Sequence, residues 1–255
     1  TIRIGARRSP LARVQAEQVG RALQAADASL RIEYCFIEAS GDRSAEPSAA
    51  VVTARGGFTE DLGQMLDDGG IDLAVHSWKD LPLQQRSGTE VMATLPRADA
   101  RDVLLIRRDA VADSAGARAL TILSSSARRR LHLEDFLGWA LPVRDRAVRF
   151  APVRGDIGTR LAKLMRGDGD ALVIAKAAID RLLDADGKAL CEAGVIDAAR
   201  MADTQRSVRA ALGACRAIVL PLSQCPAAPA QGALAIEARR DTPLRELLRA
   251  INDRD

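Results

Sequence analysis

The chain has 255 residues, enough for one large or two ordinary domains, and its 47% hydrophobic and 28% charged residues are typical of a soluble globular protein. A net charge of +3 and an aromatic content of 3% argue against a surface that binds nucleic acid. No apolar run reaches the length of a membrane span, and the first residues lack a signal-peptide pattern. We therefore expect a cytoplasmic protein without membrane contact.

Cysteine and histidine are too sparse and too scattered to predict a metal site. The four cysteines, Cys35, Cys191, Cys215 and Cys225, lack metal-ligand spacing and are interpreted as reduced thiols. The only histidines are at positions 76 and 132. We expect no bound metal.

Short strands alternate with helices along the chain. The predicted strands are 2–6, 31–39, 71–75, 91–95, 103–106, 120–123, 148–153, 171–175, 217–220 and 231–237. Predicted helices follow most of these strands, two more are expected around 188–194 and 203–214, and a last one begins at Thr242-Pro243. Residues 43–57 lack a period and are interpreted as a long loop. The alternation predicts an α/β fold with mostly parallel sheets and helices on both faces.

The predicted strand 71–75 follows two glycines and carries polar residues at its carboxyl end. These are His76, Ser77, Lys79 and Asp80. Ligands of open α/β sheets bind outside the carboxyl ends of the strands, and a cation beside a carboxylate keeps both groups charged. We interpret His76 as a positioning or core residue. In an arbitrary protein an exposed Lys-Asp turn is the commoner explanation, so this assignment depends on the other motifs.

Three other predicted strand ends carry arginine beside a helix start. Arg7 precedes the Ser9-Pro10 helix start, Arg128 to Arg130 follow three serines, and Arg154 and Arg160 flank a glycine-bearing turn. Free backbone N–H groups, hydroxyls and guanidinium groups together favour an anion. The alternatives are an exposed loop arginine for Arg7 and a solvated basic face for 128–130.

Five blocks of the sequence, in order, resemble the porphobilinogen deaminase family, also called hydroxymethylbilane synthase. They are RIGARRSPLA at 3–12, AVHSWKDLP at 74–82, SSSARR at 124–129, VRGDIGTRL at 153–161 and PAQGA at 229–233. The blocks cover nearly the whole chain, and the His-Ser-x-Lys-Asp-x-Pro pattern is specific to that family.

The resemblance implies two lobes like those of a periplasmic binding protein, with a cleft between them, and a third domain. It places domain 1 at 1–97 plus 230–255 and domain 2 at 98–229. The segment 184–220 is longer than the link usual in the family. Its helices either cover surface or form a dimer contact, so we expect a monomer or a dimer through 184–220.

The resemblance also implies a transferase of tetrapyrrole and heme biosynthesis that condenses four porphobilinogen molecules and releases ammonia each time. Each substrate is a pyrrole with an acetate and a propionate. Asp80 would be the catalytic carboxylate. Residues expected to bind substrate or cofactor carboxylates are Arg7, Ser9, Ser77, Lys79, Ser124, Ser125, Ser126, Arg128, Arg129, Arg154, Arg160 and Arg181. Candidate loop contacts are Asp42, Arg55, Phe58 and Gln231, with Arg55 standing where the family has lysine.

The family carries a covalent dipyrromethane primer on a glycine-flanked cysteine of its third domain. We expect that domain to be absent from this chain, and none of the four cysteines matches the attachment position. Two alternatives to a porphobilinogen-condensing enzyme remain. One is a two-domain paralogue acting on a smaller pyrrole-like or amino anion, and the other is a non-enzymatic polycarboxylate-binding protein.

Overall fold

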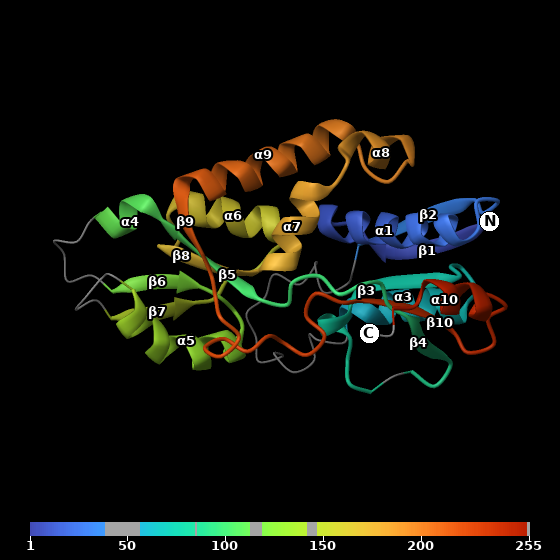
Figure 1. Ribbon diagram of the computed structural model, residues 1–255, viewed down its shortest axis with the longest axis horizontal. Coiled ribbons are helices and arrows are strands. Elements are labelled where there is room, and N and C mark those ends of the chain that lie inside the picture. The colour runs from blue at the N-terminus through green and yellow to red at the C-terminus, as the bar shows by residue number, and fades with distance from the viewer. Residues whose placement is uncertain (39–56, 85, 113–118, 142–146, 254–255) are drawn as a thin grey trace. The chain divides into compact units, whose positions relative to one another are not determined.

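The computed structural model describes residues 1–38, 57–84, 86–112, 119–141 and 147–253 (Figure 1). The chain packs into two compact units. The first unit consists of Thr1–Ala98, Ala185–Ala198 and Gly232–Asp255, and the second of Asp99–Asp184 and Ala199–Gln231. The piece Ala185–Ala198 packs with the first unit, although the sequence grouped it with the second domain. Except for Gly57, the predicted loop 43–57 lies outside the described residues.

The first unit contains a five-stranded mixed sheet in the order β2-β1-β3-β10-β4. Its strands are β1 (Ile2–Arg7), β2 (Ile32–Ile37), β3 (Leu73–Ser77), β4 (Thr89–Ala93) and β10 (Leu234–Arg239). Strand β1 runs parallel to β2 and β3, and β10 runs antiparallel to β3 and β4. The helices of this unit are α1 (Pro10–Ala26), α3 (Gly57–Asp67), α8 (Gly187–Glu192), α10 (Arg245–Ile251) and the 3₁₀ turn η2 (Trp78–Asp80).

Alternating side chains bury both faces of this sheet. Leu73 and Val75 pack with α1 and α10 in one apolar cluster, whereas Ala74 packs with Leu62 and Leu66 of α3 in another. Successive residues of a strand point to opposite faces, so one short apolar run supplies both cores.

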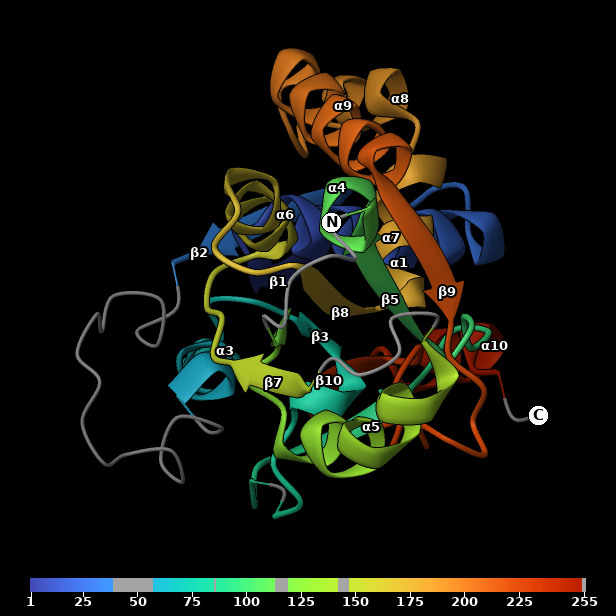
Figure 2. The same ribbon diagram turned by 90° about the vertical axis from the view of Figure 1, so that its left-hand side faces the viewer.

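The second unit contains a five-stranded mixed sheet in the order β7-β6-β8-β5-β9. Its strands are β5 (Asp102–Arg107), β6 (Leu120–Leu123), β7 (Val148–Ala151), β8 (Ala171–Ala175) and β9 (Cys215–Val219). Its helices are α4 (Arg108–Ala112), α5 (Ala127–Ala140), α6 (Ile157–Arg166), α7 (Lys176–Asp184) and α9 (Ala198–Ala214), whose first residue is grouped with the first unit. Helices α5 and α6 lie on opposite faces of the sheet (Figures 1 and 2).

The two sheets have the same topology. In each, a central strand (β1 or β6) runs parallel to both neighbours, and one antiparallel strand (β10 or β5) separates the third parallel strand from the edge. The predicted pair of α/β lobes with flanking helices is confirmed. The sheets are mixed because β10 and β5 each enter after the chain has passed from the other unit.

Local sequence signals explain several of the helix starts. Ser9 caps α1 with Pro10 in its first turn, and Ser126 caps α5. Several predicted boundaries were wrong by two residues or more; for example, the helix expected around 203–214 begins at Ala198, and the strand expected at 231–237 runs from Leu234 to Arg239. Strand β3 begins at Leu73 and extends to Ser77, and α10 begins at Arg245, where the Thr242 hydroxyl accepts a hydrogen bond from the Leu244 N–H instead of capping the helix. Among the described residues, no helix has both the length and the apolar character needed to span a membrane.

The backbone conformation at position 155 requires glycine, so Gly155→Ala should destabilise the protein by about 1–3 kcal/mol. Its φ is 107°, and an added Cβ would lie 2.5 Å from the Thr159 methyl carbon. The matched control is Gly138→Ala on α5, where a Cβ meets nothing within 4 Å. Urea unfolding should show the control unchanged or about 0.5–1 kcal/mol more stable. Equal stability of the two variants would contradict the claim.

Candidate functional site

The predicted residues of the first unit gather at one edge of its sheet. Strands β1 and β3 are parallel, so their carboxyl ends meet there. Arg7 is the last residue of β1. The Ser9 hydroxyl accepts a hydrogen bond from the Ala12 N–H at 3.3 Å, and this bond holds the hydroxyl at the start of α1. Ser77 ends β3, and Lys79 and Asp80 follow it exposed on η2.

Backbone contacts to the start of β10 hold the η2 turn. The Trp78 N–H donates to the Ala233 carbonyl at 3.1 Å, and Ser77 pairs with Leu234. The Ser77 hydroxyl lies 3.0 Å from the amide nitrogen of Gln15, a buried residue of α1 that the sequence did not single out. Asp80 therefore projects from a turn whose backbone is anchored on two sides.

A buried polar cluster lies behind this turn. His76 is 6% exposed, and its Nε2 lies 2.9 Å from the Glu237 carboxylate. Thr89 donates its hydroxyl to the other oxygen of Glu237 at 2.5 Å. Burial raises the pKa of Glu237, but these hydrogen bonds outweigh burial and leave the pKa below its usual value. The sequence missed Glu237; its one signal was an acidic residue within the apolar strand 234–238.

The serines of the second unit connect two neighbouring strand ends. The Ser125 hydroxyl donates to the Val153 carbonyl at 2.8 Å and accepts from the Val153 N–H at 2.9 Å. Ser126 caps α5, and the hydroxyl of buried Ser124 accepts from the Ser126 N–H. The turn that bears Arg128 and the turn that bears Arg154 are thus fastened together.

Arg128 and Arg129 both bind a protein carboxylate, that of Asp102 at the start of β5. Asp102 is fully buried. Arg129 contacts it through Nε at 3.0 Å and Nη2 at 2.7 Å, and Arg128 through Nη2 at 2.9 Å. Arg129 also donates to the Val173 carbonyl, and Arg128 to the Pro226 carbonyl. One carboxylate balances only one of these two cations.

Asp102 has further partners from the loop after β9. The Gln231 amide donates to Asp102 at 2.9 Å and to the Ala100 carbonyl at 2.6 Å, and the Cys225 sulfur lies 3.6 Å from the carboxylate. Burial raises the pKa of Asp102, but the hydrogen bonds and charge of Arg129, with help from Arg128 and Gln231, lower it to about 2. Asp102 could not be recognised from the sequence, because it lies in a polar stretch that matches no motif.

Of the remaining predicted arginines, Arg154 and Arg160 lie beside the end of β7, whereas Arg181 is in the last turn of α7. Arg154 is exposed after β7, and Arg160 on α6 is half-buried, with its Nε donating to the Gly155 carbonyl at 2.7 Å. Arg181 lies on α7 and is 9% exposed; burial lowers its pKa. Because β6, β7 and β8 are parallel, the helices that carry these arginines all begin at one edge of the sheet.

Some predicted contacts are not described. Asp42, Arg55 and the side chain of Phe58 lie outside the described part of the chain. Within that part, no group of three or more histidine, cysteine, aspartate or glutamate side chains is placed to hold a metal ion. Cys215 and Cys225 are buried, and burial raises the pKa of each thiol.

The fold is thus that of an α/β protein of two units, each with basic and hydroxyl side chains at the carboxyl ends of parallel strands, an arrangement that favours anionic ligands in general. Residues 2–246 match the family described as "Porphobilinogen deaminase, dipyromethane cofactor binding domain". The chain belongs to the porphobilinogen deaminase family, as the sequence predicted.

Two relatives named porphobilinogen deaminase agree with that assignment. The chain is 35% identical over 255 residues to porphobilinogen deaminase of Mycolicibacterium gilvum, covering 100% of this chain and 69% of the relative. It is 33% identical over 181 residues to the enzyme of that name from Ruminiclostridium josui, covering 71% of this chain and 57% of the relative. A solved structure, the Bordetella pertussis BvgS periplasmic VFT2 domain, is 14% identical with a TM-score of 0.49, covering 98% of this chain and 86% of that one.

Asp102 and its two arginines should make the free energy of unfolding depend on pH in the acidic range. The folded pKa of about 2 lies below the ordinary 3.8, so the stabilisation is complete above pH 3.8 and is lost as pH falls toward 2. The loss amounts to about 2 kcal/mol. Asp102→Asn should lack this step and should cost about 3 kcal/mol at neutral pH, because two arginines lose their counter-charge.

Urea unfolding across acidic pH measures both effects. The matched control is Asp135→Asn, an exposed residue of α5. It should follow the unsubstituted protein. If Asp102→Asn loses as much unfolding free energy between pH 3.8 and pH 2 as the control does, the Asp102 carboxylate is not the source of the pH dependence.

Proposed function

We propose that this protein condenses porphobilinogen, or a closely related pyrrole, by deamination in tetrapyrrole biosynthesis. The single observation that carries the proposal is Asp80, which lies exposed at the carboxyl end of β3 within the family's His-Ser-x-Lys-Asp-x-Pro block. Basic side chains lie near the strand ends of both units, which suits a substrate with two carboxylates.

Asp80 would stabilise positive charge during the reaction. The bond between the aminomethyl carbon and its nitrogen breaks, and the nitrogen leaves as ammonia. A cationic azafulvene remains. A carboxylate held close to it lowers the energy of this cation and accepts a hydrogen bond from the pyrrole N–H. A carbon–carbon bond then forms to the next pyrrole, whose ring carbon loses its proton.

The arginines would bind and orient carboxylates. Arg154 is exposed, and Arg128 keeps 22% of its side chain accessible although it contacts Asp102. Since two guanidinium groups share the Asp102 carboxylate, the cluster keeps one positive charge for a ligand. Arg129, at 10% exposed, is better placed to hold Asp102 than to contact substrate.

We propose that the same edge of the second unit holds the carboxylates of a dipyrromethane group, which matches its excess of cations. When bound, that group supplies the end to which new pyrroles are joined. The buried thiols of Cys215 and Cys225 have raised pKa values and hence little thiolate, so neither is proposed as an attachment point. Intact mass of the purified protein, followed by peptide mapping, identifies any attached group.

Asp80→Asn tests the catalytic role. Ammonia release from porphobilinogen should fall at least about 100-fold, because the charge that stabilises the cation is gone. Binding of porphobilinogen should stay within about 3-fold, since its carboxylates bind elsewhere. Asp135→Asn is the control and should keep full activity. A protein that binds porphobilinogen but releases no ammonia, with and without an added dipyrromethane acceptor, would instead be a polycarboxylate-binding protein.

Arg154→Ala separates ligand binding from fold stability. Its guanidinium is exposed on a turn, so the unfolding free energy should change by less than about 0.5 kcal/mol. Porphobilinogen affinity should fall about 10-fold, because a charge-assisted hydrogen bond is lost. Calorimetric titration measures the affinity, with exposed Arg149 on β7 as the matched Arg149→Ala control. Equal affinity of both variants would remove Arg154 from the site.

A further inference from the structure

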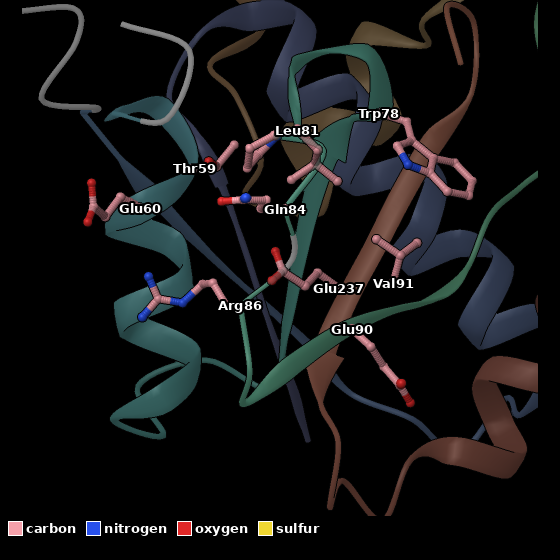
Figure 3. Close-up of a pocket in the computed structure, with 10 residues that line it drawn as sticks. Thr59, Glu60, Trp78, Leu81, Gln84, Arg86, Glu90, Val91 and Glu237 are labelled. Atoms are coloured by element: carbon pink, nitrogen blue, oxygen red, sulfur yellow. The ribbon is translucent and has the colours of Figure 1, made fainter. Parts of the chain in front are cut away.

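The two strand-end turns of the first unit are supported in different ways. Beside η2 lies a pocket of about 240 Å³, and Figure 3 shows Trp78, Leu81 and Glu237 around it. His76 of β3 and Thr89 of β4 each bind one oxygen of the Glu237 carboxylate. The η2 turn is therefore supported from within its own sheet.

The other turn, residues 7–9 between β1 and α1, is held by Arg13. The Arg8 N–H donates to the Ile37 carbonyl of β2 at 2.9 Å. The Arg8 carbonyl accepts from the Arg13 Nε at 3.0 Å. Arg13 lies in the first turn of α1, and its own N–H donates to the Ser9 carbonyl at 3.0 Å. One backbone group of this turn is thus satisfied by a side chain and not by the sheet.

Two further contacts fix the orientation of the Arg13 guanidinium. Its Cζ lies 4.0 Å from the centre of the Phe36 ring on β2, and its Nη1 donates to the Val195 carbonyl. The guanidinium is a rigid plane, so Nε and Nη1 can serve two carbonyls only when that plane is held in one orientation. The ring and the Val195 carbonyl supply that orientation.

Val195 belongs to the segment 185–198, which packs with the first unit. Val195 is fully buried and Ile196 is 5% exposed. Helix α8 ends in a left-handed turn at Gly194, whose φ is 67°, and the Val195 N–H donates to the Leu190 carbonyl at 2.9 Å. This turn sets the direction in which the Val195 carbonyl points.

We propose that Arg13 and the segment 185–198 form a brace that positions Arg7 and Ser9 for an anionic ligand. The Arg13 guanidinium is already engaged by two carbonyls and a ring, so it acts on the ligand only through the turn and is a positioning residue. A turn that is held in place before the ligand arrives costs less free energy to order on binding. The inference rests on the proposed function, and it gives part of the long stretch 184–220 a role within one chain.

Amide hydrogen exchange tests the brace without any ligand. Arg13→Met removes the guanidinium donors and keeps an unbranched side chain. Exchange at the N–H groups of Arg8 and Ala12, which both take part in hydrogen bonds of the turn, should become at least about 5-fold faster. Arg21→Met, at an exposed arginine of the same helix, is the matched control and should leave both rates unchanged. Unchanged rates in Arg13→Met would overturn the proposal.

Porphobilinogen affinity tests whether the brace acts through Arg7. In calorimetric titration, Arg13→Met should weaken binding about 5-fold, and Arg13→Lys, which can still reach one carbonyl, about 2-fold. In the Arg7→Ala background, Arg13→Met should not weaken binding further, although its effect on the unfolding free energy should be the same in both backgrounds. An equal loss of affinity in both backgrounds would indicate a general structural role and would contradict the proposal.

Gly194→Val tests the contribution of the segment 185–198. Valine is strained at a φ of 67°, so the Val195 carbonyl should shift and porphobilinogen affinity should fall about 3-fold. Gly213→Val on α9 is the control, because an added Cβ meets nothing within 4 Å at either position and only Gly194 of the two has a left-handed φ. Normal binding by Gly194→Val would remove the segment from the brace. If the unsubstituted protein does not bind porphobilinogen, the proposed function fails, and the exchange rates alone decide whether the brace exists.

Discussion

The second unit depends on the buried carboxylate of Asp102. That one side chain joins the start of β5, the first turn of α5 and the loop that precedes β10. An ion in so dry a place is tolerated only when its partners satisfy it, and Arg128, Arg129 and Gln231 do so together. Two guanidinium groups share this one carboxylate, and the proposed binding of anions at the same sheet edge depends on the positive charge that is left over.

The two units share one sheet topology, and each buries an acidic side chain on the equivalent antiparallel strand. In each sheet, parallel strands end at a common edge, and an antiparallel strand beside them carries an acidic residue into the interior. In the second unit that residue is Asp102 on β5, and in the first it is Glu237 on β10. Asp102 binds two arginines, whereas Glu237 contacts His76 and Thr89. The two acidic residues lie at different positions of their strands, because Asp102 begins β5 and pairs with Ala175 at the carboxyl end of β8, whereas Glu237 pairs with Ala74 near the amino end of β3.

Periodicity was sufficient to predict the α/β lobes, because buried strands such as 171–175 and 120–123 are continuous apolar runs. Motifs were sufficient to locate Asp80 and the arginines at strand ends. Neither could reveal that Arg129 is largely committed to Asp102, since the two residues are 27 positions apart and meet only after the sheet forms. The contact between His76 and Glu237 was missed for the same reason, since these two residues are 161 positions apart in the sequence.

The most direct test of the account is the stoichiometry of the reaction with porphobilinogen. Ammonia and linear tetrapyrrole should be quantified from the same incubation of the purified protein, with and without a dipyrromethane acceptor. The account predicts one ammonia for each pyrrole consumed. Binding of porphobilinogen at the arginine-rich edges with no ammonia released under either condition would contradict it.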